Sequence, residues 1–256
     1  MSSLYETGVR ALVDDYMLEK AKEERDYGEY WSASSAGYCM RKLVFERLKV
    51  PKTQDDDARK QRVFEVGHIF HGWMQNITKS RGFSIAQEQE LQNEDLMVRG
   101  HFDDLILADG KPILYDYKTQ NSRAFTWQKG KPMSYFHHMQ LGTYMYMLRH
   151  ERDVPPVLRG NPLTEARILK ISKDDLRTSE QQLMWSEDLE VEIKTFWGVL
   201  NRHWREKTIP PCTCKDREGG FMAGEKYNPF FYDGEPCSLE WYNKCKREGL
   251  LKEEIK

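Results

Sequence analysis

The chain has 256 residues, and its 39 lysines and arginines nearly balance 41 aspartates and glutamates, so that the formal net charge is −2. This length suits one elaborated domain, and 39% hydrophobic residues supply enough material for a packed core. These values exclude a disordered acidic protein, and no apolar run approaches the roughly 18 residues of a membrane helix. The balanced charge also argues against nucleic-acid binding by bulk attraction, although it allows a local basic groove.

The first residues lack the basic, apolar and small-residue order of a signal peptide. Because no membrane helix is expected either, we predict a soluble, cytoplasmic protein without a membrane partner. The five cysteines are unevenly spaced, with one near the start and four in the last 45 residues. In a cytoplasmic chain such a cluster indicates a metal site more than disulfides.

Three helices are predicted before the first strands. Residues 4–25 suit a surface helix that ends near Gly28, and residues 40–48 suit a second helix that stops before Pro51. The third helix runs from Ala58 to about Lys79. Its apolar residues recur at steps of three and four and predict one buried stripe: Val63, Val66, Phe70, Trp73 and Ile77.

Short alternating apolar segments then predict a three-stranded meander over residues 83–91, 97–107 and 112–119. A helix is expected from about Ser134 to Arg149, followed by a strand over residues 165–171 and a long helix from about Ser179 to Trp204. The fold class is therefore α/β, in the order helix, three strands, helix, strand. Residues 1–207 form the expected body, and residues 208–256 form a cysteine-rich C-terminal arm packed on it.

Acidic residues and one lysine meet on the second and third predicted strands. Asp103 and Asp104 point to opposite faces by strand alternation, so only one of them can face a given site. Asp116 and Lys118 share a face, where the carboxylate can hold a divalent cation and the lysine can orient or deprotonate a water. With the Tyr117 carbonyl, these hard oxygens suit Mg²⁺ or Mn²⁺. A solvated strand edge with an ion pair is the plainer alternative, but the neighbouring apolar runs favour a buried site.

His71 is a further candidate metal ligand. It lies at the border of the apolar stripe, one turn after Gly67, whose missing side chain leaves room for a ligand or a strand. A histidine in a helix is more often a core residue whose ring nitrogens have hydrogen-bond partners, yet imidazole is also a common ligand for Mn²⁺.

The ordered motifs resemble the PD-(D/E)XK nuclease superfamily, and specifically its RecB-like branch, which includes CRISPR-associated adaptation exonucleases and the nuclease domains of AddAB helicases. The resemblance covers more than half of the chain, over about residues 34–148 and again near the C-terminus. Each motif is weak alone, but their order and spacing together are specific. The matching segments are SSAGYCMRK at 34–42, GHIFH at 67–71, GHFD at 100–103, DYKT at 116–119 and QLGTY at 140–144.

The resemblance implies a restriction-endonuclease-like core with a metal-dependent active site. His71, Asp103 and Asp116, with the Tyr117 carbonyl, would hold Mg²⁺ or Mn²⁺, and Lys118 would act on the attacking water. Two more residues follow from the resemblance alone. Gln140 and Tyr144, one helical turn apart, match the family's Q-x-x-x-Y motif, which supports the active site and contacts DNA.

The resemblance also implies the activity. We expect a deoxyribonuclease that hydrolyses phosphodiester bonds, and by family likeness an exonuclease that acts on single-stranded DNA or DNA ends in recombination, repair or phage DNA processing. It would work in the cytoplasm of a bacterial or phage-infected cell, with any helicase or recombination protein as a separate chain. Two other functions remain: a non-catalytic DNA-binding module that retains the nuclease fold, and a structural zinc protein.

Many members of this branch bind a 4Fe-4S cluster through one N-terminal and three C-terminal cysteines. The resemblance matches Cys39 to the first of these and finds the rest among Cys212, Cys214, Cys237 and Cys245. The late cysteines depart from the family pattern, because no C-x-x-C is present and either Cys212 or Cys214 has to replace a missing ligand. Zinc held by the four late cysteines, with Cys39 a buried thiol, is the competing hypothesis, and free thiols are the third.

Two basic stretches favour DNA as the substrate. Residues 41–62 hold eight basic against four acidic residues, and residues 111–131 hold five against one. Basic side chains can follow a nucleic-acid backbone, and aromatic rings such as Phe125 can stack on bases. A solvated face is the plainer alternative for any single residue. The residues expected to contact DNA are Arg41, Lys42, Arg123 and Trp127.

Overall fold

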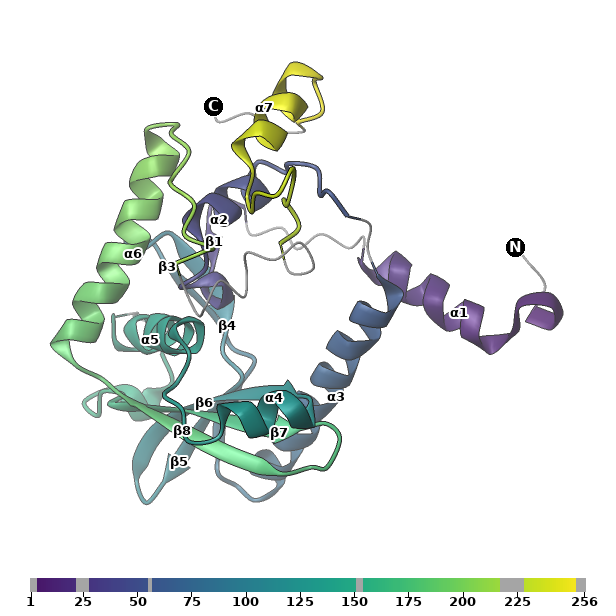
Figure 1. The fold of residues 1–256 in the computed structure, drawn as a ribbon. Coiled ribbons are helices and arrows are strands. Elements are labelled where there is room, and N and C mark those ends of the chain that lie inside the picture. Colours follow the sequence, from purple (N-terminus) through teal and green to yellow (C-terminus); the bar gives the residue numbers. More distant parts are fainter. Residues whose placement is uncertain (1–3, 22–27, 55–56, 151–153, 217–227, 252–256) are drawn as a thin grey trace.

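The computed structural model describes residues 4–21, 28–54, 57–150, 154–216 and 228–251, which form two β-sheets with helices packed around them (Figure 1). The larger sheet has the strand order β2-β5-β6-β7-β8, and the smaller has the order β1-β4-β3. The strands are β1 Trp31–Ser32, β2 Ser84–Gln87, β3 Glu90–Asn93, β4 Val98–His101, β5 Asp104–Ala108, β6 Lys111–Gln120, β7 Glu165–Ser172 and β8 Thr178–Met184. The predicted α/β class is therefore confirmed.

Strand β6 is the centre of the larger sheet. It pairs with β5 in antiparallel register only as far as Tyr115, which lies opposite Asp104. On its other side it pairs in parallel with β7 as far as Gln120, opposite Ser172. The last five residues of β6 therefore have a strand partner on one side alone, and the edge that faces β5 is open there.

Two helices cover opposite faces of the sheet near this open edge. Helix α5 (Tyr135–His150) buries ten consecutive residues, Met139–Leu148, because it lies between the sheet and α6 (Glu187–Arg205). Helix α3 (Ala58–Ser80) crosses the other face, where a Cβ placed at Gly67 would lie 3.4 Å from Thr119 Oγ1 on β6. This is an ordinary contact distance, so the approach of β6 does not by itself require glycine at position 67. The remaining helices are α1 Leu4–Ala21, α2 Met40–Arg47, α4 Ser122–Gln128 and α7 Leu239–Arg247, with short 3-10 turns at Ala33–Ser35 and Pro156–Leu158.

The predicted meander is wrong in its number of strands. The segment 83–91 is divided at Glu88, which has a φ of 48°, and the segment 97–107 is divided at Asp103. The positive φ at Glu88 and the bend at Asp103 turn the chain out of the extended conformation, so the two halves of each apolar segment can join different sheets. Strands β2 and β5 enter the larger sheet, whereas β3 and β4 pair with each other beside β1.

The long helix predicted over residues 179–204 is also wrong at its start. Residues Thr178–Met184 form β8, the edge strand of the larger sheet, in antiparallel register with β7. The helix itself begins at Glu187, where the Ser186 side chain accepts a hydrogen bond from the Leu189 backbone. Polar residues such as those of β8 have weak intrinsic preferences, so pairing with a neighbouring strand decides their conformation.

Helix α3 lies where it was predicted, but its apolar stripe is not buried. None of its residues is fully buried, and Val63, Trp73 and Ile77 keep 43%, 50% and 38% of their surface exposed. The reason is that α3 contacts mainly β6, β2 and α1, and α1 projects away from the body (Figure 1). The predicted N-terminal helix ends at Ala21, and its expected residues 22–25 lie outside the described residues.

The described residues after 207 pack on the body, as expected of the C-terminal arm. The Thr53 backbone donates to the Pro229 carbonyl at 2.8 Å, and the Trp241 indole donates to the Pro51 carbonyl at 2.7 Å. Phe230 joins the same core as Phe45 of α2, with ring centroids 5.4 Å apart. In the described residues no helix is long and apolar enough to cross a membrane.

Candidate active site

The open end of β6 brings Asp116, Lys118 and Gln140 together. Lys118 Nζ lies 2.9 Å from Asp116 Oδ1, and Gln140 Nε2 of α5 donates to the same oxygen at 3.0 Å. The Asp116 side chain is only 5% exposed, and its other oxygen, Oδ2, is buried without a hydrogen-bond partner in the described structure. A buried carboxylate oxygen without a partner is costly, and a cation would satisfy it.

Asp103 lies in the bend between β4 and β5, outside a strand, which corrects the strand position expected for it. Its Oδ2 accepts a hydrogen bond from the Tyr117 backbone N–H at 2.7 Å, the group that β5 leaves unpaired. His71 Nδ1 of α3 lies 3.5 Å from the same oxygen. Asp104 is fully buried elsewhere and accepts from Thr78, Ser84 and Tyr117 hydroxyls. Of the two, Asp103 is the one near His71 and Asp116, but strand alternation does not account for this, because Asp103 lies in a bend.

The electrostatics of these groups indicate a missing positive charge. Burial, together with the Asp116 carboxylate, raises the pKa of Asp103 to about 8. Burial and the nearby Lys118 ammonium lower the pKa of His71, so its imidazole is neutral and has a lone pair to donate. Burial alone would lower the pKa of Lys118, but the carboxylates of Asp116 and Asp103 outweigh it and raise that pKa.

This donor set fits a hard divalent cation, because two carboxylates, an imidazole and the Tyr117 carbonyl are ligands that Mg²⁺ or Mn²⁺ accept. The ligand atoms of His71, Asp103 and Asp116 do not yet converge. In the described part of the chain, one group of three or more His, Cys, Asp or Glu residues has all its ligand atoms within 4.8 Å of one another, and that group consists of cysteines. The three side chains would therefore have to rotate toward one another to share an ion.

Asp103→Asn should stabilise the protein at high pH in the absence of added Mg²⁺ or Mn²⁺. The raised pKa means that the folded state favours protonated Asp103, so its contribution to stability is present below pH 4 and is lost as the pH rises toward 8. Asparagine does not ionise, so we expect a gain of about 2 to 5 kcal/mol in unfolding free energy at pH 8 and little change at pH 4. Thermal melts at both pH values measure this, and equal pH slopes in the two proteins would contradict it.

Tyr144, one turn after Gln140, reaches Gly100 of β4 with its ring. A Cβ added at Gly100 would lie 2.9 Å from the Tyr144 hydroxyl and 2.9 Å from the Ala33 Cβ. The glycine of the GHFD motif thus makes room for the tyrosine of the Q-x-x-x-Y motif. Tyr144 is buried against β4, and through this contact it supports the strand that leads into Asp103.

Gly100→Ala should destabilise the protein, because the new methyl group meets a ring and a Cβ that cannot swing aside. We expect a loss of about 1 to 3 kcal/mol in unfolding free energy. Gly142→Ala is the matched control, since the atoms nearest to its methyl group would be the Cδ1 atoms of Leu189 and Ile193, which can shift by a rotamer change. Denaturant titration of the two variants checks the difference, and an equal loss in both would contradict it.

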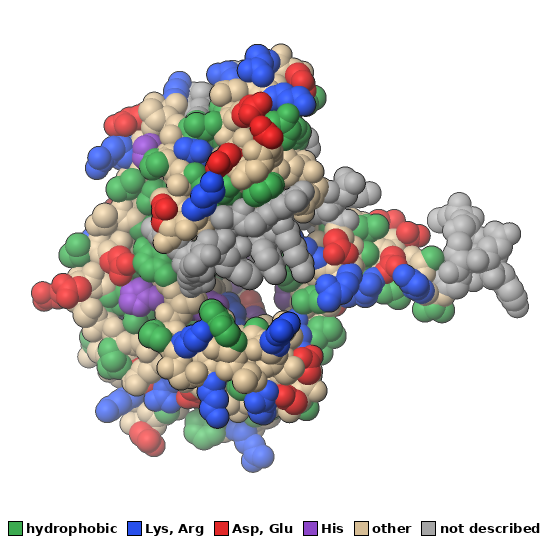
Figure 2. Space-filling model, viewed as in Figure 1, with side chains coloured by type: hydrophobic (Ala, Val, Ile, Leu, Met, Phe, Trp, Pro, Cys, Tyr) green, Lys and Arg blue, Asp and Glu red, His purple; other side chains and the backbone are tan. Residues whose placement is uncertain are grey.

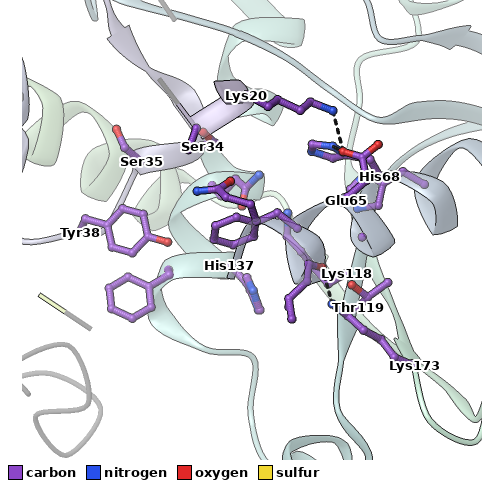
Figure 3. Close-up of a pocket in the computed structure, with 18 of the residues that line it drawn as sticks. Lys20, Ser34, Ser35, Tyr38, Glu65, His68, Lys118, Thr119, His137 and Lys173 are labelled. Carbon is purple, nitrogen blue, oxygen red and sulfur yellow. Dashed lines mark hydrogen bonds and ion pairs between the residues drawn. The ribbon is translucent and has the colours of Figure 1, made fainter. Parts of the chain in front are cut away.

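A pocket of about 950 Å³ opens beside these residues, between α1, α2, α3 and α5 (Figure 3). Lys118 and Gln140 line it, and so do three further lysines: Lys20, Lys42 and Lys173. Figure 2 shows a hollow near the middle of one face, with basic side chains along the rim beneath it. Two glutamates line the pocket as well, and they pair with two of these lysines: Glu65 lies 2.6 Å from Lys20 Nζ, and Glu46 lies 3.3 Å from Lys42 Nζ. Four lysines against two glutamates still leave the lining net positive.

The expected DNA-contacting residues lie in different places. Lys42 lines the pocket, whereas the Arg41 guanidinium donates to the carbonyls of Pro210 and Cys237 and so joins α2 to the C-terminal arm. Arg123 and Trp127 are on the surface of α4, and Trp127 is 67% exposed under the ammonium of Lys131. Phe125 is buried, so it is not available to stack on a base.

The sequence analysis missed several pocket residues. Phe136 and His137 precede Gln140 by one turn on the same helix, and this spacing was a usable signal. Lys173 directly follows β7, the strand parallel to β6. Lys20 had no signal, because only the packing of α1 against α3 brings it to the pocket.

A second cluster consists of four cysteines from both ends of the chain. The sulfur atoms of Cys39, Cys212, Cys214 and Cys237 all lie within 4.8 Å of one another, and none forms a disulfide. Backbone and amide N–H groups surround them: Thr213 N lies 3.4 Å from the Cys39 sulfur, and Asn228 Nδ2 lies 3.3 Å from the Cys237 sulfur. Four close thiols with such donors can hold a metal ion as thiolates.

This arrangement corrects two expectations about the cysteines. Cys245 is buried in the core and lies outside the cluster. The cluster therefore contains both Cys212 and Cys214, whereas we had expected only one of these two. The hypothesis of a site made from the late cysteines alone is also wrong, because Cys39 is one of the four. Cys212 and Cys214 are two residues apart, and the turn at residues 214–216 follows them, so both sulfur atoms lie in the same cluster.

Comparison with known proteins found solved structures that share part of this fold at low sequence identity. The crystal structure of SSO0001 is 16% identical, with a TM-score of 0.49 over 77% of this chain and 87% of that one. An alkaline exonuclease from Laribacter hongkongensis is 16% identical, with a TM-score of 0.44 over 68% and 87%. A phage-related exonuclease from Haemophilus somnus 129PT is 13% identical, with a TM-score of 0.41 over 65% and 79%. No curated protein matches the sequence.

The family model of the PD-(D/E)XK nuclease superfamily matches residues 41–202, which is more than half of the chain. The matched segment contains the motif residues that the structure gathers at the end of β6. The chain therefore belongs to the PD-(D/E)XK nuclease superfamily.

Proposed function

We propose that the protein is a divalent-metal-dependent deoxyribonuclease that acts as an exonuclease on single-stranded DNA or DNA ends. The observation that carries the proposal is the buried, unpartnered Asp116 oxygen beside Lys118, in a pocket ringed by lysines. His71, Asp103, Asp116 and the Tyr117 carbonyl would hold Mg²⁺ or Mn²⁺. The ion, when bound, supplies an activated water and stabilises charge on the phosphate.

The side chains of the site have separate roles in this proposal. Gln140 holds the Asp116 carboxylate in place through its hydrogen bond to Oδ1. Lys118 is an ammonium in the metal-free site, where both carboxylates raise its pKa. A cation that neutralises those carboxylates would make it easier for Lys118 to lose its proton. Lys118 can then position the attacking water and help to take up its proton.

The pocket suits the end of a single strand. Its lysines can bind phosphates, although Lys20 and Lys42 would have to exchange their glutamate partners for them. The rings of Tyr38 and Phe136, with centroids 4.9 Å apart, offer apolar surface to a base. On the outer surface, Arg123 and Trp127 of α4 would guide the strand further from the site. Among the structural relatives, the Laribacter hongkongensis exonuclease has been solved with dAMP, a DNA mononucleotide.

Cleavage assays on end-labelled oligonucleotides test this function. With Mn²⁺ we expect mononucleotides or short products from linear single strands and none from a covalently closed single-stranded circle. Cleavage of the circle would show an endonuclease instead. If no DNA is cut, Mn²⁺ titration by calorimetry decides between an inactive enzyme and the alternative of a non-catalytic DNA-binding module, which need not hold the ion.

For the cysteine cluster we propose a single structural Zn²⁺ in place of the 4Fe-4S cluster implied by the family likeness. Four sulfurs at about 2.3 Å around one tetrahedral ion lie about 3.8 Å apart. The Cys39–Cys212 and Cys214–Cys237 sulfur distances are 3.9 and 3.5 Å. A cube of four irons and four sulfides between the same sulfurs would hold them farther apart.

A further inference from the structure

His137 lines the pocket but has no role in the site as described so far. It lies in the first turn of α5, three residues before Gln140, so both side chains project from neighbouring positions on one face of the helix. Gln140 reaches Asp116 from this face. The imidazole of His137 lines the same pocket as Lys118 (Figure 3). The helix therefore presents His137 to the space that a bound strand would occupy.

The imidazole of His137 lacks a partner in the described structure. Its Nδ1 is shielded from water and makes no hydrogen bond there. The next residue differs, because His138 Nε2 lies 3.1 Å from a Glu192 carboxylate oxygen. A shielded nitrogen without a partner costs free energy, and a ligand that accepts or donates a hydrogen bond would remove this cost.

The charge of His137 suits a phosphate beside a lysine. Burial and the nearby Lys118 ammonium lower the pKa of His137 to about 4, so the ring is neutral at neutral pH. A neutral imidazole carries one N–H donor and one acceptor nitrogen. It can bind a phosphate oxygen next to Lys118 without bringing a second positive charge against the ammonium.

We propose that His137 is a substrate-binding residue that donates a hydrogen bond to a non-bridging phosphate oxygen of the bound DNA strand. This inference rests on the proposed function, since it requires a nucleic-acid strand in the pocket. The contact needs a turn of the ring about its terminal side-chain torsion, which is soft for histidine. A hydrogen bond to an ionised group of this kind corresponds to about tenfold or more in affinity.

The test measures binding, so its result does not depend on catalysis. Dissociation constants are determined without added Mg²⁺ or Mn²⁺ for fluorescent single-stranded oligonucleotides, each with one uncharged methylphosphonate linkage at a different position. Wild-type protein should lose about tenfold in affinity at one particular linkage. His137→Ala should bind the unmodified strand about tenfold more weakly and be indifferent to that linkage.

Two further variants sharpen the comparison. His137→Asn places an amide N–H near the position of Nδ1 and should recover part of the affinity, whereas His138→Ala should bind as the wild type does. The inference is overturned if His137→Ala binds unmodified DNA normally, or if it still loses affinity at the same linkage. Recovery of affinity in His137→Asn, together with unchanged circular dichroism of each variant, distinguishes a lost contact from a change in folding. Failure of the nuclease proposal would appear separately, as wild-type protein that binds DNA but never cuts it with Mn²⁺.

Discussion

Asp116→Asn should lower the single-turnover rate constant of Mn²⁺-dependent DNA cleavage by at least about a thousandfold, which corresponds to about 4 kcal/mol of activation free energy. The substitution removes the negative charge of the one carboxylate whose buried oxygen has no partner. The amide oxygen can still accept the hydrogen bond from Gln140, so the variant should fold. Quenched-flow cleavage of an end-labelled strand at saturating protein measures the rate.

Asp109→Asn is the matched control, because Asp109 lies exposed in the turn between β5 and β6. Its φ of 50° is a conformation that asparagine also tolerates. This control should cleave at the wild-type rate. Lys118→Ala should cost about 10² to 10⁴ in rate, as expected for a group that assists proton transfer. Full Mn²⁺-dependent activity in both Asp116→Asn and Lys118→Ala would rule out this active site.

Cys39→Ser should remove the structural metal and lower the melting temperature by roughly 10 °C or more. The reason is that metal binding by four thiolates contributes directly to folding free energy, and a few kcal/mol shift the melting point of a chain of this size by that much. Elemental analysis should find one zinc per chain in the wild type and less than a tenth of that in the variant.

Cys245→Ser provides the control for a buried cysteine outside the cluster. It should keep its zinc, although the loss of a buried thiol will lower its stability slightly. Equal zinc loss in both variants would contradict the proposed ligand set. Brown protein that contains iron and inorganic sulfide would contradict zinc and restore the family's 4Fe-4S cluster.

The sequence predicted those parts of the fold and site that depend on short spacings. The two-residue step from Asp116 to Lys118 determines that they share a face of β6, and their ion pair at 2.9 Å agrees with this. The order of apolar residues also located α3 and α5 to within about a residue. The catalytic roles of these residues remain predictions, because geometry alone does not test them.

Other parts depend on contacts between distant segments, which spacing does not contain. The apolar stripe on α3 was predicted from a helical period, but the period does not say which other elements pack on the stripe. In the structure few elements do, and the stripe stays partly exposed. Residues 179–184 were assigned to a helix, because the local sequence does not show that this segment pairs with β7. Similarly, the distance along the chain left open which of Cys212 and Cys214 would meet Cys39, and it did not reveal that both would do so without Cys245.

The cysteine cluster can form only late in translation, because its members come from both ends of the chain. Cys39 directly precedes α2, which carries Lys42 of the pocket wall, and its nearest sulfur neighbour, Cys212, is 173 positions further along the chain. At 5 to 20 residues per second, a ribosome needs roughly ten to thirty seconds to make that interval. Until then a metal held by these four cysteines could not close around Cys39. On the zinc proposal, the start of α2 is therefore joined to the C-terminal arm only after the whole of β6, with Asp116 and Lys118, has been made.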